Sequence, residues 1–159
     1  MISISVICVG KLKEKYLKNG CEEYLKRLSA FAKTQIIEIP EERCGDDPSL
    51  AEIETVIEKE GERIAGKIPK GAAVIPLCIE GKELRSDEIA SEIEKISLAN
   101  SKIAFVIGGS FGLSEKIKAL GRVRLSFGRI TLPHQLARLV LLEQIYRAFS
   151  ILNHSRYHK

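Results

Sequence analysis

The chain has 159 residues, of which 45% are hydrophobic, and a formal net charge of +4 at neutral pH. This size predicts one compact domain spanning residues 1–159. The absence of an eighteen-residue apolar run and of a secretory pattern at the start excludes a membrane protein and predicts a cytoplasmic location, without a membrane partner.

Positive charge is concentrated in the last quarter of the chain. Residues 116–159 contain nine Lys or Arg residues and a single acid, Glu143. Because arginine suits phosphate recognition, this region predicts a polyanionic partner such as RNA. A second basic cluster includes Lys11 and Lys13, for which a solvated surface is an equally good interpretation.

Apolar runs with strand composition alternate with segments of helical period along the whole chain. The strands are expected at residues 2–9, 35–39, 73–79, 103–107 and 123–127. This alternation predicts an α/β domain with a mainly parallel sheet and helices on both of its faces.

Helices are expected at residues 13–32, at 48–67 after the capping-box pattern of Ser49 and Glu52, from Ser86 onward, and at 134–152. Apolar residues surround most of the last helix, more than one sheet face can cover. A two-fold homodimer would supply the second apolar surface. Burial by loops of the same chain is the alternative.

Two glycine turns follow strands in the last third of the chain: IGGSFG (107–112) and SFGR (126–129). Glycine lets a backbone approach a ligand closely, so the two turns predict a shared cofactor cleft. The first has the spacing GGxxG, which disfavours a dinucleotide site, and no phosphate-binding P-loop motif occurs. Gly81 is expected to form a plain strand-to-helix turn.

Four segments together carry a resemblance: LCIEGK (77–82), VIGGSFGL (106–113), LSFGRITLPHQ (125–135) and the ending YHK. The chain closely resembles the small SPOUT-class methyltransferases that methylate a pseudouridine in bacterial large-subunit ribosomal RNA. The resemblance covers the whole chain. It implies a C-terminal trefoil knot, an obligate homodimer and S-adenosylmethionine as the cofactor. It places the cofactor against Leu77, Gly108, Gly109, Phe127, Gly128, Arg129, Ile130, Thr131 and Leu132.

Methylation of an imide nitrogen needs either a base or cations that stabilise the deprotonated ring, and the sequence leaves both open. His134 begins the last helix beside the second turn, and acts on the substrate or fixes the loop. The resemblance brings the tail to the active site, which makes Tyr157 and His158 further candidates. RNA contacts are expected from Arg138, Arg156, Lys159 and Lys11, on an assembled ribosome rather than naked RNA. No metal site is expected, because two histidines in a tail are a weak signal.

Two other functions remain open at this point. A non-catalytic RNA-binding module would explain the basic end of the chain. A Rossmann-like enzyme acting on a small metabolite would explain the glycine turns.

Overall fold

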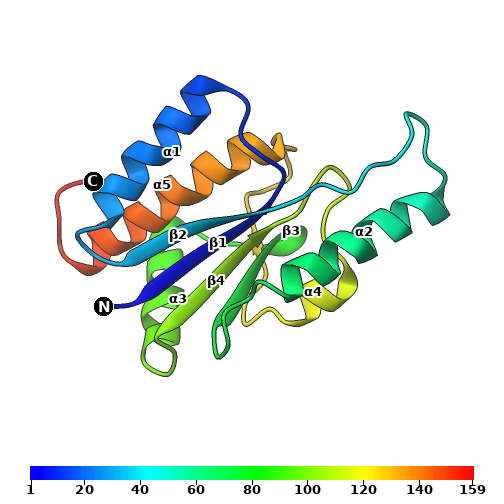
Figure 1. Cartoon of the computed structure of the whole chain (residues 1–159). Helices are drawn as coiled ribbons and strands as arrows, with labels where there is room; N and C mark the ends of the chain where they lie inside the picture. Colours follow the sequence, from blue (N-terminus) through cyan, green and yellow to red (C-terminus); the bar gives the residue numbers. More distant parts are fainter.

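A computed structural model describes residues 1–159 as one five-stranded sheet with helices packed on both faces (Figure 1). All of the strand pairs are parallel, in the order β2-β1-β4-β3-β5. The strands are β1 (Ser3–Val9), β2 (Lys33–Ile39), β3 (Ala73–Glu83), β4 (Lys102–Ile107) and β5 (Leu125–Ser126). The predicted α/β architecture is confirmed.

Five helices connect or follow the strands: α1 (Lys15–Leu28), α2 (Leu50–Ala65), α3 (Ser86–Ser97), α4 (Glu115–Ala119) and α5 (His134–Leu152). Helices α1, α3 and α5 cover one face of the sheet, and α2 and α4 cover the other (Figure 1). The Ser49 side chain accepts from the Glu52 N–H, which completes the capping box expected at the start of α2. None of these helices is both long and apolar enough to cross a bilayer.

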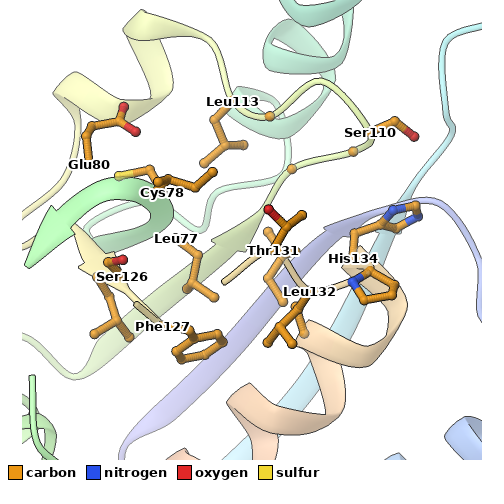
Figure 2. A pocket seen from close by; sticks show the side chains of 18 of the residues that line it. Leu77, Cys78, Glu80, Ser110, Leu113, Ser126, Phe127, Thr131, Leu132 and His134 are labelled. Atoms are coloured by element: carbon orange, nitrogen blue, oxygen red, sulfur yellow. The ribbon is translucent and has the colours of Figure 1, made fainter. Parts of the chain in front are cut away.

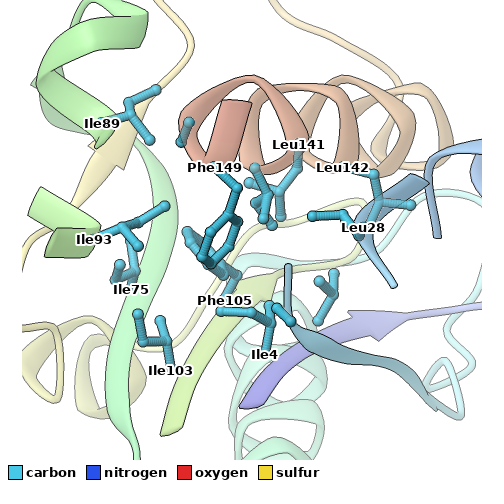
Figure 3. Packing of buried hydrophobic residues seen from close by; sticks show 14 of the residues in the cluster. Ile4, Leu28, Ile75, Ile89, Ile93, Ile103, Phe105, Leu141, Leu142 and Phe149 are labelled. Carbon is cyan, nitrogen blue, oxygen red and sulfur yellow. The ribbon is translucent and has the colours of Figure 1, made fainter. Parts of the chain in front are cut away.

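The larger part of the core lies between the sheet and helices α1, α3 and α5. Phe105 of β4 and Phe149 of α5 occupy its centre, with Leu28 of α1 and Ile93 of α3 on either side (Figure 3). A smaller cluster under α2 and α4 contains Ile64. Central strands buried on both faces explain why the predicted strands contain continuous apolar runs. Each fully buried aliphatic or aromatic side chain contributes about 1.5–3 kcal/mol to folding.

Helix α5 lies on the sheet with α1 packed on one side and α3 on the other. These two helices, rather than loops, cover much of its apolar circumference. One outward stripe remains half-buried, formed by Leu136, Val140, Glu143 and Arg147. The homodimer stays a prediction, and this stripe is the surface available for it.

Two sequence-based expectations differ from the structure. The strand expected at residues 123–127 is only two residues long. Gly81 is not a strand-to-helix turn but lies within β3, where a side chain would come 2.8 Å from the Arg124 carbonyl oxygen. Glycine is therefore needed at this position because β3 and the backbone of residues 124–125 approach each other too closely for a Cβ atom.

Candidate functional site

A cavity of about 690 Å³ opens at the carboxyl ends of β3, β4 and β5. Both glycine turns and the first residues of α5 line it, as Figure 2 shows. Ligands of open parallel sheets bind at this edge, where the loops that follow neighbouring strands converge. The shared cleft predicted from the two turns is therefore present.

The cavity has an apolar wall and a polar rim. Leu77, Phe127 and Leu132 lie together on one side, while Ser110 and His134 lie at one end and Cys78 and Glu80 at the other (Figure 2). Ile130 lines the mouth and is 70% exposed. An apolar wall with a few polar groups around it is the usual composition of a small-molecule site.

Eight of the nine residues expected around a cofactor line the cavity: Leu77, Gly108, Gly109, Phe127, Gly128, Ile130, Thr131 and Leu132. Arg129 is the exception: its side chain is exposed and is not part of the lining. Arg129, the one charged residue of this turn, lies between two lining residues but does not itself line the cavity, and the cofactor contacts of all nine residues stay a prediction.

Hydrogen bonds and glycine conformations fix the shape of both turns. In the first turn, the Gly112 N–H donates to the Gly109 carbonyl at 3.1 Å, and Gly112 has a φ of 86°. In the second, the Gly128 N–H donates to the Ser126 Oγ at 3.1 Å, and Gly128 has a φ of 103°. Positive φ values of this kind favour glycine strongly.

Five polar residues of the lining were not among the predicted site residues: Cys78, Glu80, Ser110, Lys118 and Ser126. Three of them form one cluster. Lys118 of α4 forms an ion pair with Glu80 at 2.5 Å, and Cys78 lies beside them on β3. The hydrogen bond from Lys118 lowers the pKa of Glu80, whereas burial raises the pKa of Cys78. Cys78 and Glu80 come just after Leu77 in the chain, and this was the available signal for these two residues. Lys118 gave no such signal, because α4 is too short for its periodicity to indicate a helix.

His134 joins the cavity to the loop between β1 and α1. Its imidazole packs against Gly10, since a Cβ atom at Gly10 would lie 3.4 Å from Nε2. The Lys13 N–H donates to the Gln135 side chain at 3.4 Å. This loop therefore brings the exposed Lys11 close to the mouth of the cavity, next to the start of α5.

The expectation that Arg138 faces RNA is wrong. Its side chain is only 3% exposed and donates to Glu38 at 2.8 Å and to the Gly10 carbonyl at 3.1 Å. Arg138 lies on the inward side of α5, where an unpaired charge would be costly, so it pairs with Glu38 of β2. It ties α5 to the ends of β1 and β2 instead of contacting a partner.

The C-terminal tail lies away from the cavity of its own chain. The Tyr157 hydroxyl is 3.2 Å from that of Tyr24 and 3.3 Å from the Glu143 carboxylate. His158 Nδ1 is 3.1 Å from an Arg147 nitrogen. Glu143 is nine residues from His134, which corresponds to roughly 14 Å along the helix axis. Tyr157, His158, Arg156 and Lys159 are therefore not beside the pocket within one chain.

The environment of Tyr157 keeps its phenol protonated. Burial, the hydrogen bond with Tyr24 and the charge of Glu143 raise the pKa of Tyr157 to about 12. Its ring also packs edge-on against Tyr146, with the centroids 4.7 Å apart. In this position Tyr157 can donate or accept a hydrogen bond but cannot supply a phenolate base at neutral pH. No group of three or more His, Cys, Asp or Glu side chains is arranged to hold a metal ion.

Comparisons with known proteins agree with these features. A family model described as "Predicted SPOUT methyltransferase" matches residues 2–158. The chain is 54% identical over 159 residues to the ribosomal RNA large subunit methyltransferase H of Listeria monocytogenes serotype 4b (strain CLIP80459), covering 99% of this chain and 100% of that protein. The protein of the same name from Bacillus thuringiensis (strain Al Hakam) has the same identity and coverage.

Two solved structures share the fold. A probable rRNA-methyltransferase from Porphyromonas gingivalis superposes with a TM-score of 0.55, covering 95% of this chain and 70% of that one. A probable methylase family protein from Haemophilus influenzae Rd KW20 gives 0.53, with 99% and 71% covered. Each is 14% identical in sequence, so these two likenesses concern the fold alone.

Proposed function

Because the chain belongs to the SPOUT methyltransferase family, we propose that it transfers a methyl group from S-adenosylmethionine to the N3 imide nitrogen of a pseudouridine in large-subunit ribosomal RNA. The observation that carries this proposal is the single cavity formed by both glycine turns at the carboxyl edge of the sheet. We also propose that this chain forms the C-terminal trefoil knot of the family.

The cavity suits the methyl donor in size and chemistry. Adenine is flat and largely apolar, so Leu77, Phe127 and Leu132 can pack against it while backbone groups of the turns bind its edges. A Cβ atom at Gly108 would lie 2.8 Å from the Gly112 backbone, so there is no room for a side chain at this position. Gly108 therefore presents only its backbone to the cavity.

The reaction is an in-line displacement that depends mainly on alignment. The imide nitrogen forms a bond to the methyl carbon as the carbon–sulfur bond breaks, the bonding electrons go to sulfur, and the imide proton is released. His134 is the histidine that lines the cavity, so we assign it the role of accepting that proton or orienting the ring. Exposed cations near the mouth, such as Lys11 and Arg129, would stabilise a negatively charged ring.

A homodimer would bring the tail to a cavity. The outward stripe of α5 runs from Leu136 and Val140 near the cavity to Glu143 and Arg147 beneath the tail. A two-fold axis across this stripe would pair two α5 helices antiparallel and place the tail of one subunit near the cavity of the other. Tyr157 and His158 would then contact the substrate there, with Arg156 and Lys159 on its phosphates.

The proposed substrate explains the distribution of charge. We propose that the target is an assembled ribosome in the cytoplasm, where a preformed RNA surface can dock against this domain. Lys11 and Arg129 are exposed near the mouth of the cavity, where they could bind phosphates.

The decisive experiment is mass spectrometry of large-subunit ribosomal RNA from cells that lack the protein. We expect one pseudouridine to lose its methyl group and to regain it when the intact protein is restored. An unchanged modification profile, together with no binding of S-adenosylmethionine in calorimetry, would contradict the proposal. RNA binding without donor binding would instead identify a non-catalytic RNA-binding module.

A further inference from the structure

Glu60 is a buried carboxylate without a counter-ion. It lies on α2 and is only 3% exposed. Its Oε2 accepts from the Glu42 N–H at 3.0 Å, while its Oε1 has no hydrogen-bond partner. The nearby cations Arg63 and Lys59 pair with the Glu42 side chain instead. A buried charge that lacks a partner destabilises the fold, so its presence points to a role in binding.

This carboxylate lies directly behind the first glycine turn. A Cβ atom on Gly109 would be 3.1 Å from Oε1 of Glu60 and 3.5 Å from Oε2. Gly109 lines the cavity, so the backbone of one residue separates the carboxylate from the cavity. The next residue of α2, Gly61, is packed so tightly that a Cβ atom there would lie 2.6 Å from Ser114 Oγ. This contact holds α2 against Ser114, the N-cap residue of α4, which follows the turn.

The other charges of the cavity largely cancel. Glu80 and Lys118 line it and form an ion pair with each other. The charged groups around Glu60 are Glu41 and Glu42 from the loop before α2 and Lys59 and Arg63 from α2 itself. Gly109 and Val9, which pack against each other beside it, carry no charge. Burial, aided by the charges of Glu41 and Glu42, raises the pKa of Glu60. A cation in the cavity would favour its ionised form.

We propose that Glu60 supplies the counter-charge for a cationic ligand in this cavity and thereby makes the site prefer the sulfonium methyl donor over its neutral thioether product. The inference rests on the proposed function. It identifies Glu60 as a specificity-determining residue that acts through the backbone of Gly109. The thioether left after transfer has the same adenine, ribose and amino-acid groups but lacks the sulfonium charge, so a buried negative charge discriminates between the two.

Isothermal titration calorimetry of S-adenosylmethionine and S-adenosylhomocysteine tests this proposal. We expect Glu60→Gln to weaken binding of the sulfonium ligand about tenfold. An effect of this size corresponds to the attraction between two opposite unit charges roughly 10 Å apart at an effective dielectric constant of about 20. Binding of the thioether should change much less. Glu62→Gln is the matched control: it removes the same charge from an exposed position on α2 and should leave both affinities unchanged.

The pH dependence of the unmodified chain gives a second readout that needs no variant. As the pH is lowered from 8 to 5, protonation of Glu60 should weaken binding of the sulfonium ligand more than that of the thioether. In Glu60→Gln this difference should be clearly smaller, because the variant removes Glu60 and leaves the other ionisable groups of the cavity, Glu80 and His134, unchanged. Thermal unfolding should show Glu60→Gln at least as stable as the unmodified chain, because the amide removes an unpaired buried charge.

Different outcomes distinguish a failure of the counter-charge proposal from a failure of the proposed function. Equal losses of both affinities in Glu60→Gln would overturn the counter-charge and assign Glu60 a role in shape alone. Unchanged affinities would also overturn it. If the unmodified chain binds neither ligand, the proposed function itself fails and this inference falls with it.

Discussion

Gly108 is the residue on which the first turn depends most directly. A Cβ atom there would come within 2.8 Å of the Gly112 carbonyl carbon and 2.9 Å of its oxygen, and backbone atoms cannot move aside as a flexible side chain can. We therefore expect Gly108→Ala to weaken binding of S-adenosylmethionine at least tenfold, measured by calorimetry, and to lower the unfolding temperature by a few degrees because the turn is strained, while the chain stays folded at room temperature. Gly45→Ala is the control, because a Cβ atom at Gly45 meets nothing within 4 Å.

The reactivity of the four free cysteines can be used to probe the cavity without any measurement of activity. Cys44 is exposed, Cys78 lines the cavity, and Cys8 and Cys21 are buried in the core. Burial raises the pKa of Cys8 to about 12, which disfavours the reactive thiolate. Labelling with iodoacetamide, followed by mass spectrometry, should modify Cys44 first, Cys78 more slowly, and Cys8 and Cys21 only after unfolding.

Saturating S-adenosylmethionine should slow the labelling of Cys78 and leave that of Cys44 unchanged. If Cys78 reacts equally fast with and without the ligand while calorimetry shows binding, the donor occupies a different site.

At the residue scale, the sequence predicted those members of the site whose role depends on local backbone. Glycines after strands, with the apolar residues beside them, form a pattern that can be read within about ten positions, and most of these residues do line the cavity. Glu60 and Arg138 could not be assigned in this way. Their surroundings are set by Gly109 and Glu38, which are distant in the chain and are brought close only by the fold.

At the scale of elements, Arg138 and Glu38 form an asymmetric ion pair between α5 and β2. Arg138 is 3% exposed, whereas Glu38 is 38% exposed and can be solvated alone. Glu38→Ala leaves a buried guanidinium without its charged partner and should lower the free energy of unfolding by about 3 kcal/mol. Arg138→Met leaves a solvated carboxylate and a filled core, and should cost less than about 1.5 kcal/mol.

Urea unfolding measures both variants. The opposite order would mean that the guanidinium finds enough hydrogen bonds without Glu38, in which case the ion pair does not anchor α5 to the sheet.

Elements with long periodic patterns were predicted well, and short ones were not. Helix α5 begins and ends where its apolar period and Pro133 indicate, and α2 begins at its capping box. The two-residue strand β5 and the five-residue helix α4 are too short to show any period. Both exist because neighbouring parts of the fold hold them: β5 pairs with β3, and α4 packs beside α2.

At the scale of the whole molecule, the separation between tail and cavity leads to a test of the proposed homodimer. Mixing two impaired variants, Gly108→Ala and a chain truncated after Leu152, should restore activity when the donor concentration is too low to saturate Gly108→Ala. A mixed dimer then contains one intact cavity paired with one intact tail. With random exchange of subunits, about a quarter of the sites are complete, so about a quarter of the unmodified activity is expected.

Analytical ultracentrifugation of each variant should show that dimers persist. No recovery in mixtures that demonstrably exchange subunits would mean that the tail does not act across the dimer. A monomer by sedimentation would contradict the dimer itself.

The residues that form the cavity become available in a fixed order while the chain is being synthesised. Strands β1 to β4 end by Ile107, whereas the second glycine turn and the start of α5 come from residues 126–137. A nascent polypeptide can therefore pair most of its sheet while the binding pocket still lacks one wall. Ligand affinity should arise only near the completion of translation, so an unfinished chain would not sequester the methyl donor.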